Sequence, residues 1–66
     1  MTNKSQVEIA CEIKRTTTKA VLIHDGAREA WIPFSQISDP AIDELVVGQH
    51  TDITVPEWLA KEKGLI

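Results

Sequence analysis

The fold of this chain is decided by the stretch Ala30-Trp31-Ile32-Pro33-Phe34-Ser35-Gln36-Ile37. It places bulky apolar side chains around a proline, in the alternating pattern of a β-strand. Ala30, Ile32 and Phe34 are expected on one face of this strand, and Trp31, Pro33 and Ser35 on the other. Because Pro33 has no N–H to donate, we expect the strand at a sheet edge, at a bulge, or where the sheet bends.

Two strands are expected before this stretch. Residues 7–14 alternate strictly between apolar and polar side chains, which predicts a half-buried strand with Cys11 on its apolar face. The polar residues 15–19 then predict a hairpin, and residues 20–24 a second strand. The pair Asp25-Gly26 predicts a type I′ turn, so the central strand-like stretch begins at about Arg28.

The chain after this stretch is expected to supply one more strand and a helix. Residues 38–40 have the composition of a turn, residues 41–45 could form one helical turn, and residues 51–55 alternate like a fourth strand. Pro56 is expected at the first position of a helix over residues 56–63, with Gly64 at its C′ position. Trp58 and Leu59 are expected to pack this short helix against the sheet.

These elements predict one mainly β domain over residues 1–66, with residues 1–5 flexible. We expect a small, strongly bent sheet or an SH3-like or OB-like barrel of four to five strands, closed by the short C-terminal helix. A chain of 66 residues has room for one small core.

Composition narrows the class of protein. The net charge of −3 argues against coating of duplex DNA or of an anionic membrane, and no apolar run is long enough for a membrane span. The one cysteine, Cys11, cannot form an internal disulfide, so we expect a cytoplasmic protein with a buried, unreactive thiol.

No residue pattern indicates catalysis, metal binding or a cofactor. His24 and His50 lack the paired spacing of a zinc site, and the glycines stand alone rather than in a phosphate-binding loop. The carboxylates form no catalytic pair. The chain is therefore expected to be a binding module rather than an enzyme.

The sequence is compatible with two kinds of binding surface, and both depend on the position of Trp31. The side chain either covers the open end of the core, which is the commoner place for a tryptophan, or stands on an outer face. If exposed, it could anchor a protein partner, with Pro33 and Phe34 beside it. Alternatively, it could stack bases of single-stranded nucleic acid next to a basic hairpin of Lys14, Arg15 and Lys19.

The negative net charge favours the protein partner. Trp31 on the same face as the basic hairpin would favour nucleic acid, whereas a buried Trp31, or one ringed by carboxylates, would favour protein. Homodimerisation through the edge near Pro33 is a third alternative, because it would enlarge the buried area of a small domain.

Two blocks of the sequence are distinctive: residues 31–37, with the pattern WIPxSQI, and residues 55–65, with the pattern VPEWLAxEKGL. Together they resemble a small domain of unknown function that occurs in phages, prophages and related mobile elements. The resemblance covers roughly the last two thirds of the chain, and Phe34 departs from the charged or polar residue expected at its position. It implies an accessory protein near replication, recombination or defence evasion, with a host or phage protein as partner, and transfers no activity to any residue.

Overall fold

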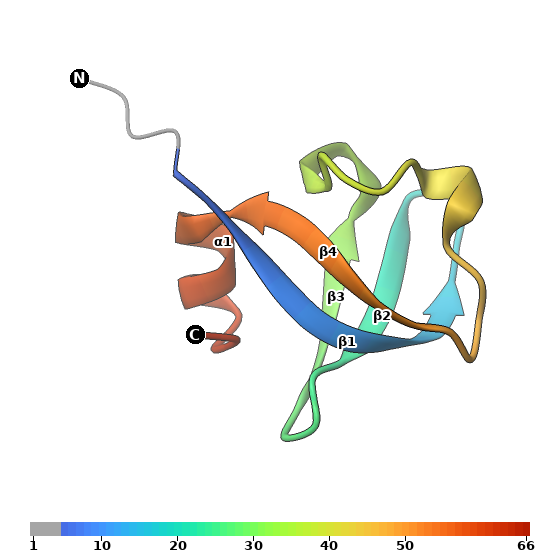
Figure 1. Cartoon of the computed structure of the whole chain (residues 1–66), viewed down its shortest axis with the longest axis horizontal. Coiled ribbons are helices and arrows are strands. Elements are labelled where there is room, and N and C mark those ends of the chain that lie inside the picture. The colour runs from blue at the N-terminus through green and yellow to red at the C-terminus, as the bar shows by residue number, and fades with distance from the viewer. Residues whose placement is uncertain (1–4) are drawn as a thin grey trace.

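The computed structural model describes residues 5–66 (Figure 1). The strands are β1 (Gln6–Thr16), β2 (Ala20–His24), β3 (Glu29–Pro33) and β4 (His50–Pro56). Two 3₁₀ turns, η1 (Phe34–Gln36) and η2 (Ile42–Glu44), connect β3 to β4, and one helix, α1 (Glu57–Glu62), ends the chain. Residues 1–5 were expected to be flexible. Residues 1–4 lie outside the described residues. The carbonyl of Ser5 accepts a hydrogen bond from Glu57 N at 3.0 Å.

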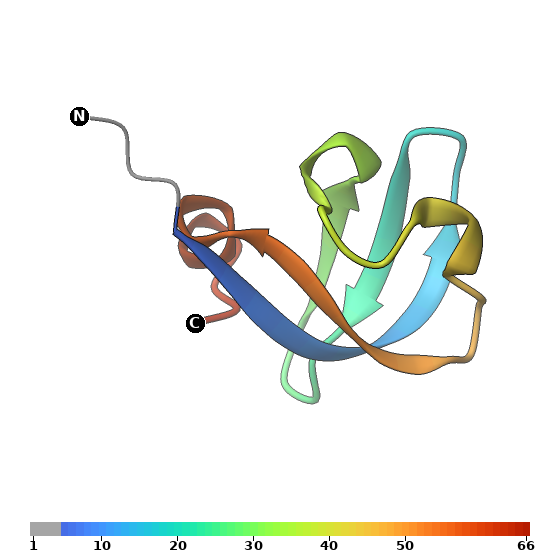
Figure 2. The ribbon, with the colours of Figure 1, turned by 45° about the horizontal axis from the view of Figure 1, so that its top comes forward.

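The mainly β fold with a short C-terminal helix is confirmed. The strands form one antiparallel four-stranded sheet in the order β3-β2-β1-β4, and the sheet is not closed. The long strand β1 pairs with β4 along residues 6–12 and with β2 along residues 12–16, so Glu12 faces both His50 and His24. Figures 1 and 2 show β1 curving from the end beside α1 into its hairpin with β2, which bends the sheet around the core.

The core lies on the concave face of this sheet. Alternate residues of every strand point inward, and Ile13, Ile23 and Ile32 are fully buried. Each such aliphatic side chain contributes roughly 1.5–3 kcal/mol through removal from water. The other core residues are Ile9, Cys11, Val21, Ala30, Ile37, Leu45, Ile53, Val55, Leu59 and Ala60. The opposite face of the sheet, which carries Leu22 and Trp31, is called the outer face below.

The two edges of the sheet differ. The β4 edge is covered in part by the segment after η1, because Ser38 N donates to Thr54 O at 2.9 Å and Thr54 N donates to Asp39 O at 2.7 Å. The other edge strand is β3, which confirms the expectation that Pro33 lies at an edge. The segment of residues 41–49 lies at the end of the molecule away from α1 (Figure 2).

The β2–β3 turn differs from the predicted type I′. Asp25 N donates to Arg28 O at 3.1 Å, so Gly26 and Ala27 are the central residues. Only Gly26 has a positive φ, at 101°, whereas a type I′ turn needs a positive φ at both positions. The Asp25 carboxylate accepts hydrogen bonds from Ala27 N and Arg28 N, each at 2.9 Å. The side chain of Asp25 thus provides the acceptor for these two backbone N–H groups of the turn.

Helix α1 closes the end of the core. It begins one residue later than predicted, because Pro56 is the extended N-cap residue that ends β4. At its C-terminus, Gly64 has a φ of 76°, with hydrogen bonds from Gly64 N to Lys61 O and from Leu65 N to Ala60 O. These bonds form a Schellman motif and confirm Gly64 at C′. Leu59 and Ala60 are buried, but Trp58 is 55% exposed, so the prediction that Trp58 packs on the sheet is wrong.

Candidate binding surface

Trp31 stands on the outer face, and the favoured expectation of a buried side chain is wrong. It is 42% exposed, whereas its neighbours in β3, Ala30 and Ile32, are buried. The reason is the strand period of two: the small Ala30 and the β-branched Ile32 fill the inward positions, which leaves Trp31 and Pro33 on the outside. Trp31 is therefore available to a ligand.

Trp31 belongs to a row of side chains that crosses three strands. Leu22 of β2 faces Trp31 in the register, and Arg15 of β1 faces Leu22 from the other side. Leu22 is half-buried and Arg15 is exposed. The row runs across the outer face as a guanidinium, an aliphatic side chain and an indole.

A β-bulge in β1 places Arg15 in this row. The β1–β2 register shifts between Ile13 and Arg15, so that Ile13 faces Ile23 while Arg15 faces Leu22. Without the extra residue, Lys14 would face Leu22 and Arg15 would point toward the core side. A bulge is not visible in the sequence pattern, so the sequence did not single out Arg15 from its basic neighbours. Leu22 was also missed, because residues 20–24 read as a continuous apolar run.

The other residues proposed from the sequence are distributed around this row. Pro33 is exposed and faces Ala20 in the register, one step along the outer face from Trp31. Phe34 begins η1 and is half-buried against the core, so it does not join Trp31 as an exposed anchor. Lys19 is exposed in the β1–β2 hairpin, before β2 begins, and is not part of the row.

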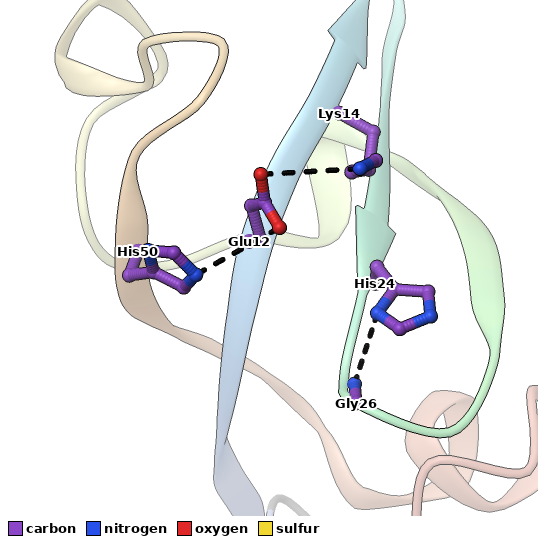
Figure 3. Close-up of polar contacts among 5 residues, drawn as sticks. All are labelled: Glu12, Lys14, His24, Gly26 and His50. Atoms are coloured by element: carbon purple, nitrogen blue, oxygen red, sulfur yellow. Dashed lines mark hydrogen bonds and ion pairs between the residues drawn. The ribbon is translucent and has the colours of Figure 1, made fainter.

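Carboxylates lie beside the row, on the side opposite Pro33. Glu12, His24 and Glu29 face one another in the register of β1, β2 and β3, one step from Arg15, Leu22 and Trp31. Figure 3 shows the Glu12 carboxylate between Lys14 Nζ at 3.9 Å and His50 Nε2 at 3.7 Å. Exposed pairs at these distances contribute little to stability. Lys14 therefore lies toward Glu12, and Arg15 is the cation in register with Leu22.

An open groove of about 700 Å³ continues from this acidic side. Glu12, His24, Asp25, His50 and Asp52 line it, together with the residue Cys11, whose side chain belongs to the core. His24 is oriented by a hydrogen bond of 3.1 Å that its Nδ1 accepts from Gly26 N, as Figure 3 shows. Burial, followed by the charges of Asp52 and Asp25, raises the pKa of Cys11 to about 11, so the thiol is protonated at neutral pH.

The described part of the chain, residues 5–66, contains no group of His, Cys, Asp and Glu side chains arranged to hold a metal ion. Within the same residues, no helix has the length and apolar character to cross a membrane. Comparison with models of protein families found no match, and comparisons with curated proteins and with solved structures found none either.

Proposed function

We propose that this chain is a non-enzymatic binding module that docks a protein partner on the outer face of β2 and β3. The observation that carries the proposal is the exposure of Trp31, 42%, next to Leu22 and Pro33 on an edge strand. Tryptophan is the side chain most often found at the energetic centre of protein interfaces, because it removes a large apolar area from water at a low cost in conformational entropy.

The charges around Trp31 support a protein rather than a polyanion. Glu29 lies two residues before Trp31 on the same face, and Glu12, Asp25 and Asp52 surround the neighbouring groove. With a net charge of −3, the chain repels a nucleic acid at long range. In a protein partner, apolar side chains would complement Trp31 and Leu22, and basic side chains would complement Glu29 and the carboxylates of the groove.

Single-stranded nucleic acid is the second candidate, and the row Arg15, Leu22, Trp31 favours it. A base stacked on the indole would lie across Leu22 from a guanidinium that can bind phosphate. Anisotropy of a labelled single-stranded oligonucleotide at low and physiological salt tests this candidate. Arg15→Ala should then weaken binding more than Lys19→Ala, which removes an equal charge outside the row Arg15, Leu22, Trp31. Absence of binding even at low salt would remove the candidate.

The proposal includes a cellular setting and a finer fold class. We place the module in the cytoplasm, as an accessory protein of a phage or related mobile element, on the strength of the resemblance of residues 31–37 and 55–65. The strongly bent open sheet also fits the family of SH3-like and OB-like small barrels, in which exposed aromatic side chains commonly carry ligand binding.

The test compares three forms of the protein as bait in cells that carry the mobile element. Wild type and Trp58→Ala should retain the same partner, and Trp31→Ala should lose it. Trp58 is a matched control because it is also an exposed tryptophan, at 55%, but belongs to α1. Retention of the partner by Trp31→Ala, with loss on Trp58→Ala, would overturn the proposal.

A further inference from the structure

We propose that β3 pairs with β3 of a second copy of this chain, in antiparallel register centred on Trp31. This goes beyond the proposed function, because it concerns the backbone edge of β3 rather than the side chains that dock a partner. The pairing joins two four-stranded sheets into one continuous sheet. The open edge of β3 supports the pairing, and the sequence of β3 selects its register.

The edge of β3 carries unused backbone hydrogen-bonding groups. Asp25 N donates to Arg28 O at one end of the β2–β3 pair, and Phe34 N donates to Lys19 O at the other. Because an antiparallel ladder alternates, Arg28, Ala30, Ile32 and Phe34 direct their backbone groups toward β2. Glu29, Trp31 and Pro33 therefore direct theirs away from the sheet. Within residues 5–66, no backbone hydrogen bond outside the sheet uses Glu29 or Trp31.

Within residues 5–66, no other segment forms a backbone hydrogen bond with this edge. The principal packing of α1 is against β4 and β1, and Gly64, which follows α1, lies next to the end of the Arg28 side chain, before β3. The segment after η1 pairs with β4, which protects that edge and not the edge of β3. Exposed edges are pairing sites unless a charge, a proline or a covering segment blocks them. Here Pro33 removes one donor at one end of the strand and Glu29 adds an exposed charge at the other, which restricts the pairing to few registers. The backbone donors of Glu29 and Trp31 remain.

The sequence of β3 selects one register for pairing with itself. With Trp31 opposite Trp31 of the second copy, the two central residues exchange both backbone hydrogen bonds. Each Glu29 N–H then donates to the Pro33 carbonyl of the other copy, so the missing donor of Pro33 costs only one bond at each end. This register overlaps the whole five-residue strand. A register centred on Glu29 would place two carboxylates opposite each other, which is unfavourable.

The dimer would complete the outer face. In this register the outer faces of the two copies lie on the same side of the joined sheet. The row Arg15, Leu22, Trp31 of one copy therefore meets the row of the other copy at the two tryptophans. Directly opposite residues of a hydrogen-bonded antiparallel pair have Cα atoms about 5.5 Å apart, which lets the indoles pack against each other. The second copy thereby contributes its own Trp31 to the docking surface, and an arginine lies at each end of the combined apolar row.

The test uses the intact chain. Sedimentation equilibrium between about 10 μM and 1 mM should show the mass rising from monomer to dimer, a weak association as expected for a short strand interface. Trp31→Pro removes the central donor without removing any hydrogen bond to β2, and should abolish the dimer. Trp31→Ala keeps the donor and is the matched control for loss of the indole, so it should retain measurable association. Circular dichroism should show that both variants fold.

A cross-linking measurement fixes the register. Under mild oxidation, Trp31→Cys should form a covalent dimer, whereas Glu29→Cys should not, because two copies of position 29 would lie roughly 14 Å apart. The buried Cys11 does not compete in either variant. A monomer at every concentration, undiminished association of Trp31→Pro, or equal cross-linking at positions 29 and 31 would each overturn the proposal. None of these outcomes bears on the partner comparison of Trp31→Ala with Trp58→Ala.

Discussion

Trp31 and Leu22 face each other across β2 and β3, on the side of the sheet that does not contact the core. An aromatic and an aliphatic side chain at this spacing stabilise a strand pair by roughly 0.2–1 kcal/mol, which is modest for so large a side chain. Trp31 thus contributes less to stability than its size would allow in a core. The proposed docking role of Trp31 requires such an exposed position.

Replacement of Trp31 should therefore cost less than replacement of its buried neighbour. Trp31→Ala is expected to lower the free energy of unfolding by about 1–2 kcal/mol, and Ile32→Ala by about 2–5 kcal/mol, because Ile32 is fully buried and leaves a cavity. Urea denaturation of both variants measures the difference. A larger loss for Trp31→Ala than for Ile32→Ala would mean that the indole supports the core.

The fold was largely predictable because the apolar residues alternate. Residues 7–13 place four inward side chains on one face of β1, and Pro33 and Gly64 lie where their backbone chemistry predicts, at a sheet edge and at C′. Closure of the sheet was not predictable from these signals, since alternation fixes the face of each strand but not how far a bent sheet curls. The type I′ prediction for the β2–β3 turn was wrong because the Asp25 carboxylate, rather than the Asp25 backbone carbonyl, accepts the hydrogen bonds from Ala27 N and Arg28 N.

The candidate surface was predictable only in part. Trp31 and Pro33 lie on the outer face because they are two residues apart in one strand, and this spacing can be read from the sequence. The neighbours of Trp31 depend on pairing between strands, so Leu22 was not recognised, and the bulge that selects Arg15 rather than Lys14 has no signature in the sequence. Phe34 lies on the core side with Ala30 and Ile32, as the alternation predicts, and this half-burial separates it from the exposed Trp31.

Gly64 should be sensitive to substitution mainly through its backbone. A φ of 76° disfavours any residue with a Cβ, so Gly64→Ala should cost about 1 kcal/mol. An added Cβ would also lie 2.5 Å from the Arg28 guanidinium, but that group is the end of a flexible side chain. The same substitution made in an Arg28→Ala background should therefore cost nearly as much, as thermal denaturation of the four forms would show. A cost that vanishes without Arg28 would assign the effect to the contact instead.

The Cys11 thiol should make the protein sensitive to alkaline pH. Its pKa is raised to about 11 in the folded state, so the folded protein binds a proton that the unfolded chain releases at lower pH. The stabilisation is complete below the pKa of an exposed thiol, about 8.5, and is lost as the pH rises through about 11. Denaturation at a series of pH values should show this loss in wild type. Cys11→Ala should lack that component, and an identical alkaline slope in both forms would contradict the assignment.

The Asp25 carboxylate should titrate below its ordinary range. Hydrogen bonds from the backbone N–H groups of Ala27 and Arg28 lower its pKa from the usual 3.8. Its contribution to stability is present above that value and is lost as the pH falls through the folded-state pKa. Carbon NMR of the side-chain carboxyl group measures the midpoint directly. A midpoint at or above 3.8 would show that these hydrogen bonds do not form in solution.

Chemical-shift mapping of the labelled chain, on titration with the partner recovered by wild type, tests most directly whether the outer face is the docking surface. Amide and indole shifts should be centred on Arg15, Leu22 and Trp31, which belong to three different strands and meet only in the folded sheet. Shifts confined to α1 or to the exposed Val46 and Val47, with Trp31 unperturbed, would contradict it.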